Sequence, residues 1–275
     1  MSRAAKRLKP LVYVILGIYA VITFVPFLWA LSASFKSMPE IVSGGMHIIP
    51  KHFTFDNYRT IFRQEPLFTR WFLNSAIIAL SVTAFNLLFN SMAGYALARI
   101  KFPGSTLMFY SILGMIMIPG QLTIIPSYLI IKELGWLNSY QAIIVPMAAQ
   151  ATYIFMMRQF FINFPRELEE ASQLDGLGRF GTFFRVVLPL AKPALAAQTI
   201  FIFMGAWNEF LKPLMLMSDK AMFTLSIGLN TFKGQYISFW NYIMAASIIM
   251  TLPALLIYIF FNRFFVQGVT FTGSK

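Results

Sequence analysis

The polar side chains best suited to a specific contact lie in one segment, residues 163–193, between two apolar stretches. Three carboxylates follow Pro165 at once: Glu167, Glu169 and Glu170. Proline suits the first position of a helix, and carboxylates in the first turns are stabilised by the helix dipole. The chemistry this pattern offers is ionic contact with a partner or with the chain's own helix end.

The same segment predicts a short helix with one small apolar face. Its apolar residues recur at i, i+3 and i+6: Leu168, Ala171 and Leu174. Three glycines then end it: Gly176, Gly178 and Gly181. A helix of about ten residues is marginal alone in water. Its exposed apolar face therefore predicts a docking element.

Other chemistry is poorly represented in the chain. There is no cysteine, and His47 and His52 are the only histidines, so we expect no thiolate nucleophile and no metal site. The sequence has no HExxH, no paired Asp in the apolar stretches and no GxxxxGK[ST] phosphate loop. We expect no catalytic residue.

The composition indicates a membrane protein. Of the 275 residues 58% are hydrophobic and 12% charged, against about 25% charged residues in soluble domains. Each apolar stretch meets the roughly 20 residues needed to cross the bilayer, and a single segment in lipid must be helical. The sequence predicts one all-α membrane domain over residues 1–275, with six transmembrane helices at about 11–33, 71–97, 105–130, 139–160, 194–217 and 241–265.

The charge distribution predicts the orientation of these helices. The side that holds both termini, the loop near 98–104 with Arg99 and Lys101, and residues 158–193 carries 13 Lys and Arg against four acidic residues. The opposite side carries nine basic residues against six acidic ones. By the positive-inside rule, both termini are expected in the cytoplasm. The net charge of +12 is then mainly a topology signal, and we expect no nucleic-acid partner.

The segment 163–193 also resembles a known family. Membrane subunits of binding-protein-dependent ABC importers share a pattern of Glu-Ala-Ala, three residues, Gly, nine residues and Ile-x-Leu-Pro. This chain has Glu170-Ala171-Ser172, then Gly176, then Val186-Val187-Leu188-Pro189. Ser172 replaces Ala and Val186 replaces Ile. Length, span number, Trp207–Phe210 and Arg263–Thr270 are similar to the shorter permease subunit of maltose-type sugar importers.

The resemblance implies the type I permease fold of ABC importers and a passive role in an ATP-driven pump. The partners would be a second permease, two ATP-binding cassette subunits that hold ATP and Mg, and an extracytoplasmic sugar-binding protein; this chain would bind no cofactor and would lie in a prokaryotic cytoplasmic membrane. The residues expected to couple it to the ATPase are Glu167, Leu168, Glu170, Ala171, Ser172, Leu174, Asp175, Gly176, Leu188 and Pro189.

Polar residues within the apolar stretches are candidates for the transport pathway, because such groups usually face the bundle interior. They are Asn86, Asn90, Gln121, Thr123, Gln198, Trp207, Asn208 and Glu209. Amides, carboxylates and an aromatic face suit a sugar. Close helix packing explains the asparagines equally well, and an i,i+3 ion pair with Lys212 could occupy Glu209. Pro119 and Gly120 predict a broken third helix.

A different class of function stays open, that of an autonomous transporter driven by an ion gradient. Such proteins usually use intramembrane charges as ion relays. The apolar stretches offer almost only Glu209, which favours the importer permease.

Overall fold

The computed structural model describes residues 3–43, 47–233 and 238–271, and the side chains of 9–264 within them. The predictions that rest on side chains at the two ends of the chain lie outside this part. The long helices and the shorter elements are, in chain order, α1 (Arg3–Ala33), α2 (Met38–Val42), α3 (Asp56–Gln64), α4 (Phe68–Arg99), α5 (Ser105–Met117), η1 (Gly120–Thr123), α6 (Ile124–Glu133), α7 (Gln141–Met147), α8 (Ala151–Ile162), α9 (Arg166–Leu174), α10 (Arg179–Thr182), η2 (Phe183–Val187), α11 (Leu188–Leu190), α12 (Lys192–Trp207), α13 (Leu211–Leu216), η3 (Lys220–Met222), α14 (Leu225–Gly228), η4 (Leu229–Phe232) and α15 (Trp240–Phe271).

Within the described residues, three helices are long and apolar enough to cross a bilayer: Lys9–Ala33 in α1, Phe68–Arg99 in α4 and Trp240–Phe264 in α15. Two bent helix pairs raise the number to five if each pair is one span. The chain is therefore a multi-pass, all-α membrane protein, as the sequence predicted. The count of six stays a prediction, because the stretch 139–160 is divided between α7 and α8.

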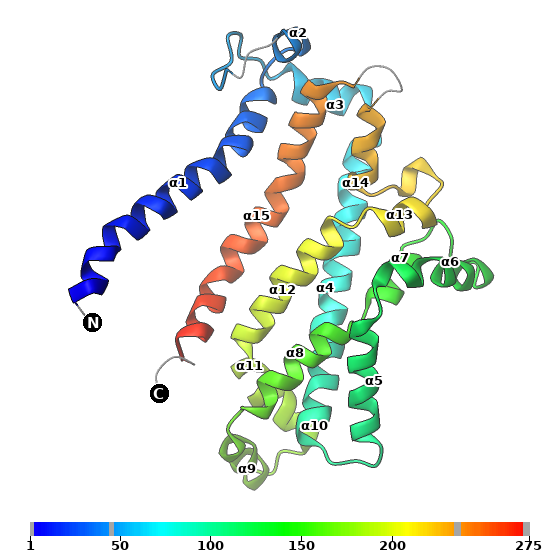
Figure 1. Cartoon of the computed structure of the whole chain (residues 1–275). Helices are drawn as coiled ribbons and strands as arrows, with labels where there is room; N and C mark the ends of the chain where they lie inside the picture. Colours follow the sequence, from blue (N-terminus) through cyan, green and yellow to red (C-terminus); the bar gives the residue numbers. More distant parts are fainter. Residues whose placement is uncertain (1–2, 44–46, 234–237, 272–275) are drawn as a thin grey trace. The chain divides into compact units, whose positions relative to one another are not determined.

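The predicted break in the third span is confirmed. Pro119 has an extended ψ of 128° directly before η1. The axes of α5 and of the following helix, from Gly120 to Glu133, differ by 96° (Figure 1). Proline has no backbone N–H and disfavours a helical residue before it, which accounts for the bend at this position.

The contacts that residues make in space divide the chain into two compact units. One is formed by 1–69 and 228–252, the other by 70–227 and 253–275. The predicted single domain stays a prediction. In the first unit the buried amide of Asn57 donates hydrogen bonds of 2.8 Å to the carbonyls of Ser34 and Lys36. Asn241 in turn donates to its amide oxygen. One asparagine thus fixes the end of α1 against α3 and α15.

A further hydrogen bond of this unit involves Glu40 of α2. The backbone N–H of Lys51 donates to the carboxylate of Glu40 at 2.7 Å. This bond lowers the pKa of Glu40, because it stabilises the charged form.

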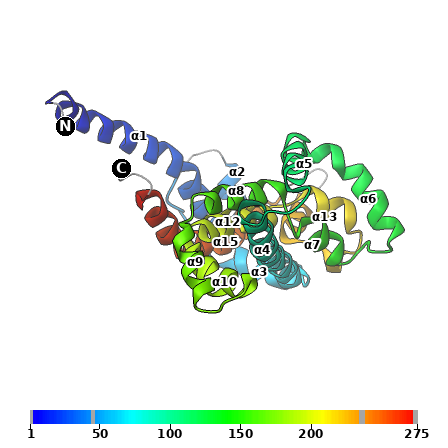
Figure 2. The ribbon, with the colours of Figure 1, turned by 90° about the horizontal axis from the view of Figure 1, so that it is seen from below.

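The second unit carries the polar segment identified above. Its helices α4, α8 and α12 surround an apolar core, and Figure 2 shows α4 nearly along its axis with α8 and α12 beside it. The buried residues of this core are Tyr95, Met157, Phe161, Phe164, Phe183, Val187, Ala191 and Ala194. In this core the end of α4 packs against Phe164, which lies before α9, and against η2 and the start of α12.

Helices α4 and α8 are in close contact at Gly94. A Cβ atom at this position would lie 2.6 Å from the Cβ of Met157 and 2.9 Å from the backbone N of Arg158. Small residues at membrane helix interfaces allow such close backbone approach. Gly94 is therefore a packing requirement.

Gly94→Ala should destabilise the chain, because overpacking typically costs about 1–3 kcal/mol. Gly114→Ala is the matched control, since its Cβ would meet nothing within 4 Å. The control should leave the thermal melting temperature in detergent unchanged or raise it slightly, because alanine favours a helix. Equal melting of both variants would show that α4 and α8 are not packed this closely.

Candidate functional site

The predicted short helix is present as α9, from Arg166 to Leu174. Pro165 directly precedes it with φ of −59° and ψ of 128°, so it occupies the N-cap position and does not form the first helical residue. Glu167 and Glu169 lie in the first turn, where the dipole favours negative charge.

The end of α9 is set by Gly176, whose φ of +83° is in the left-handed region. The N–H of Gly176 donates to the carbonyl of Gln173, and the N–H of Leu177 donates to that of Ser172, both at 3.0 Å. These two bonds form a Schellman cap, which favours glycine at the left-handed position. No heavy atom lies within 4 Å of a Cβ built at Gly176, so backbone conformation alone explains this glycine within the chain.

One face of α9 is open. Leu174 is 89% exposed and Leu168 is 41% exposed, although both are apolar. The other predicted coupling residues on this face are also exposed: Glu167, Glu170, Ala171 and Asp175. An exposed apolar stripe edged by carboxylates is suited to a protein partner with an apolar cleft and basic groups.

The opposite face of α9 is held by an ion pair. The Oε1 of Glu169 lies 3.0 Å from the Nε of Arg99, at the end of α4, and their side chains are 12% and 6% exposed. The N–H direction of Arg99 is not aligned for a hydrogen bond to that oxygen. The hydroxyl of Tyr95 donates to the Oε2 of Glu169 at 3.0 Å, and Arg99 also donates to the carbonyl of Phe164.

A second connection joins α9 to α10. The hydroxyls of Ser172 and Thr182 lie 2.8 Å apart, and both side chains are buried. Ser172 also donates to the carbonyl of Glu169 at 2.7 Å. Ser172, predicted as a coupling residue, therefore lies on the inner face and can act only through the chain's own packing.

Leu188 and Pro189 lie beyond α10, in α11, after the single π-helical turn of η2. Pro189 has no N–H for a regular helical bond, and this favours a widened turn before it. The axes of Arg179–Leu190 and Lys192–Trp207 differ by 76°. These residues thus shape the link from α9 to α12, and a direct contact with an ATPase stays a prediction.

Sequence reasoning missed Arg99, Tyr95 and Thr182 as parts of this site. The sequence indicates only a topology role for Arg99, because its partner lies 70 residues further along the chain. Two features of the sequence could have indicated the ion pair: a basic residue at the end of a span, Arg99, and an extra carboxylate beside the Glu-Ala-Ala pattern, Glu169.

The predicted pathway residues Asn86 and Asn90 are fully buried and form hydrogen bonds within the protein. Asn86 donates to the carbonyl of Met147, and Asn90 donates to the amide oxygen of Asn86 at 2.9 Å. The N–H of Gln150 donates to Asn90 at 3.1 Å. The two asparagines satisfy backbone groups that the break between α7 and α8 would leave free, and a contact with substrate stays a prediction.

Gln198 and Trp207 are also buried. Gln198 donates to the carbonyl of Tyr153 at 2.8 Å. Trp207 is 1% exposed and stacks on Phe203 with ring centroids 5.6 Å apart. In this conformation neither side chain offers a surface to a sugar.

The remaining pathway candidates lie at the surface or partly so. Gln121 and Thr123 are exposed in η1, and Thr123 lines a cavity of about 120 Å³ that Lys212 also lines. Asn208 is exposed directly after α12. The carboxylate of Glu209 accepts hydrogen bonds from the N–H groups of Leu211 and Lys212, so it caps α13.

The fold and this site define a class: a helical multi-pass membrane protein with a short helix, exposed on its apolar face, that is fixed to a membrane helix. Residues 89–271 match the family described as binding-protein-dependent transport system inner membrane component. The chain belongs to this family.

Curated relatives cover nearly the whole chain. The arabinooligosaccharide transport system permease protein AraQ of Halalkalibacterium halodurans is 36% identical over 94% of each chain. The diacetylchitobiose uptake system permease protein NgcG of Streptomyces coelicolor is 34% identical over 96% of this chain and 89% of its own. The trehalose/maltose permease protein MalG of Thermococcus litoralis is 33% identical over 93% of each.

The fold is shared with a solved bacterial ABC transporter involved in alginate import. The TM-score is 0.85, with 22% identity over 96% of this chain and 99% of that one. The predicted importer permease fold is thereby confirmed. The chain is a transport component and not an enzyme, in agreement with the sequence prediction.

The ion pair of Glu169 predicts a local stability effect. Glu169→Gln should loosen α9, because removing one partner of a buried pair costs roughly 3 kcal/mol. Amide hydrogen exchange in α9 should accelerate about 100-fold at this cost. Glu170→Gln, at the exposed neighbour, is the matched control and should leave exchange unchanged.

The double variant Arg99→Leu with Glu169→Leu should recover much of the protection, since no uncompensated charge remains. Equal exchange in Glu169→Gln and Glu170→Gln would show that the ion pair does not hold α9.

Proposed function

We propose that this chain is the permease subunit of an ATP-driven importer and forms half of the membrane pathway for a sugar or oligosaccharide. The observation that carries the proposal is α9, a helix with an exposed apolar face. Its opposite face is fixed to the rest of the chain through Glu169 and Ser172. The carbohydrates named for the relatives AraQ, NgcG and MalG support the substrate class.

In this function a cleft of an ATP-binding cassette subunit holds the exposed face of α9. Leu168 and Leu174 supply the apolar contact, and Glu170 supplies a charge for a basic group of the partner. Movement of the cleft moves α9 as a rigid body, because the Schellman cap and the dipole-favoured first turn keep it helical.

The movement then reaches the membrane helices along two routes. The first runs from Glu169 to Arg99 and Tyr95 of α4. The second runs from Ser172 to Thr182 and through η2 to α12. ATP and Mg act on the partner subunits, and this chain binds neither.

The complete transporter contains a second permease, two ATP-binding cassette subunits and an extracytoplasmic binding protein that delivers the substrate. A solved relative described as an alginate ABC transporter in complex with an alginate pentasaccharide-bound periplasmic protein supports the last partner. Both termini and α9 lie on the cytoplasmic side of a prokaryotic cytoplasmic membrane, which agrees with the positive-inside rule.

Reconstitution tests this function. Liposomes with this chain, its second permease, the ATPase and a sugar-loaded binding protein should take up labelled sugar only when ATP is supplied on the side of the ATPase. Liposomes with this chain alone should show no uptake above protein-free liposomes. Uptake by this chain alone, driven by a proton or sodium gradient, would instead support an ion-coupled transporter.

Gly176 tests the coupling role of α9. Gly176→Val should reduce transport and substrate-stimulated ATP hydrolysis together by about tenfold, because a left-handed backbone costs a side-chain-bearing residue roughly 1–2 kcal/mol. Gly176→Ala should have a smaller effect, since alanine is not β-branched. Membrane insertion and affinity for the binding protein should stay unchanged in both.

Gly178→Val is the matched control, because Gly178 has φ of −71° and ψ of 171°, which valine adopts readily. Normal transport by Gly176→Val, or equal losses in both valine variants, would contradict a coupling role for the cap of α9.

A further inference from the structure

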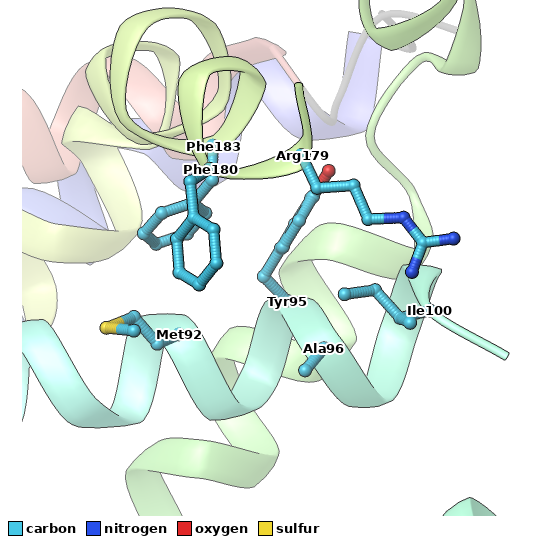
Figure 3. A pocket seen from close by; sticks show the side chains of 7 residues that line it. All are labelled: Met92, Tyr95, Ala96, Ile100, Arg179, Phe180 and Phe183. Carbon is cyan, nitrogen blue, oxygen red and sulfur yellow. The ribbon is translucent and has the colours of Figure 1, made fainter. Parts of the chain in front are cut away.

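An apolar cavity of about 290 Å³ lies between the end of α4 and the start of the helix after α9. Figure 3 shows Met92 and Ala96 of α4 on one side and the rings of Phe180 and Phe183 on the other. Phe180 is 72% exposed, so the side of the cavity that it lines is accessible from outside the chain. The guanidinium of Arg179 is directed away from the phenylalanine rings, toward Ile100.

A second cavity of about 400 Å³ adjoins the first, because both are lined by Tyr95, Ile100 and Arg179. Its further lining residues are mainly charged or polar: Arg99, Lys101, Arg166, Glu169, Glu170 and Gln173. The two cavities together form a cleft with an apolar end and a polar end.

The polar end has an excess of unpaired positive charge. Arg99 and Glu169 neutralise each other. Lys101, Arg166 and Arg179 have no ion pair among the described residues, and Glu170 is the one other carboxylate in the lining. The cleft therefore complements a molecule with an anionic group and an apolar tail.

We propose that this cleft binds an anionic phospholipid of the cytoplasmic leaflet. The acyl chain lies between α4 and the two phenylalanines, and the phosphate faces Lys101 and Arg179. The leaflet assignment rests on the proposed function, which places α9 in the cytoplasm. Basic pockets beside membrane helices on this side are suited to anionic headgroups, and phosphate forms charge-assisted bonds with Lys and Arg.

The position of the cleft along the chain supports a lipid. It lies where the apolar residues of α4 end and the basic residues Arg99 and Lys101 begin, which is the level of lipid headgroups for a membrane helix. A free sugar phosphate has no apolar part to fill the cavity beside Met92 and Phe183. A bound lipid would brace Phe180 against α4, next to the Tyr95 hydroxyl that holds Glu169.

Native mass spectrometry of the complete transporter tests the proposal. The probes are phosphatidylglycerol and phosphatidylcholine with identical acyl chains. Phosphatidylglycerol should bind more tightly, and Lys101→Gln and Arg179→Gln should each weaken it about fivefold, with a smaller loss for phosphatidylcholine, whose choline group offsets the charge of its phosphate. Arg185→Gln is the matched control, since Arg185 is exposed in the same segment and lines neither cavity.

A second measurement locates the tail. Phosphatidylglycerol with a diazirine in its acyl chain should label peptides that contain residues 92–100 and 179–183. Ala96→Phe should fill the cavity and abolish this labelling without changing the melting temperature. Because neither measurement requires transport, a failed uptake experiment would leave their result unaffected.

Three outcomes would overturn the proposal. They are equal affinity for the two phospholipids, equal losses in Arg179→Gln and Arg185→Gln, or labelling of the separated permease that disappears in the complete transporter. The last outcome would show that a partner subunit, and not lipid, occupies the cleft.

Discussion

A backbone that leaves the helical conformation inside a bilayer must find a partner for every freed N–H and carbonyl, since hydrocarbon offers none. The second unit of this protein satisfies that constraint with amide side chains of one helix. Asn86 and Asn90 of α4 bond the carbonyl of Met147 and the N–H of Gln150, on either side of the break between α7 and α8. The break is therefore possible because α4 places two amide side chains beside it.

Helix α4 also forms hydrogen bonds to non-helical segments near its start and at its end. Near its start, Asn74 donates to the carbonyls of Ala221 and Phe223 at 2.9 Å, and Ser75 accepts from the N–H of Leu225. At its end, Arg99 bonds the carbonyl of Phe164 just before α9. One continuous helix thus holds three discontinuous segments of the second unit. A displacement of α9 acts on a helix that also fixes the chain at the opposite end of the unit.

The sequence predicted what depends on local pattern. The presence of the short helix α9, its end before the glycines that begin at Gly176 and the bend at Pro119 follow from capping, glycine and proline, which act within a few residues. The partners of Asn86 and Arg99 could not be predicted, because they depend on which helices lie side by side over separations of 60 to 70 residues. For Asn86 the sequence was equally compatible with close helix packing and with a place in the transport pathway.

If α9 docks as proposed, its two neighbouring carboxylates have different tasks, one on the exposed face and one on the inner face. Successive residues of an α-helix point about 100° apart, so Glu169 and Glu170 cannot face the same surface. Glu170 is exposed and free for a partner, whereas Glu169 is 12% exposed and paired with Arg99. A docking helix that carried only the outward charge would move on its linkers when a partner pulled it. In the proposed coupling role, with the inward charge paired in a poorly hydrated site, the helix would transmit force to α4, because separating that pair would leave a buried charge without compensation.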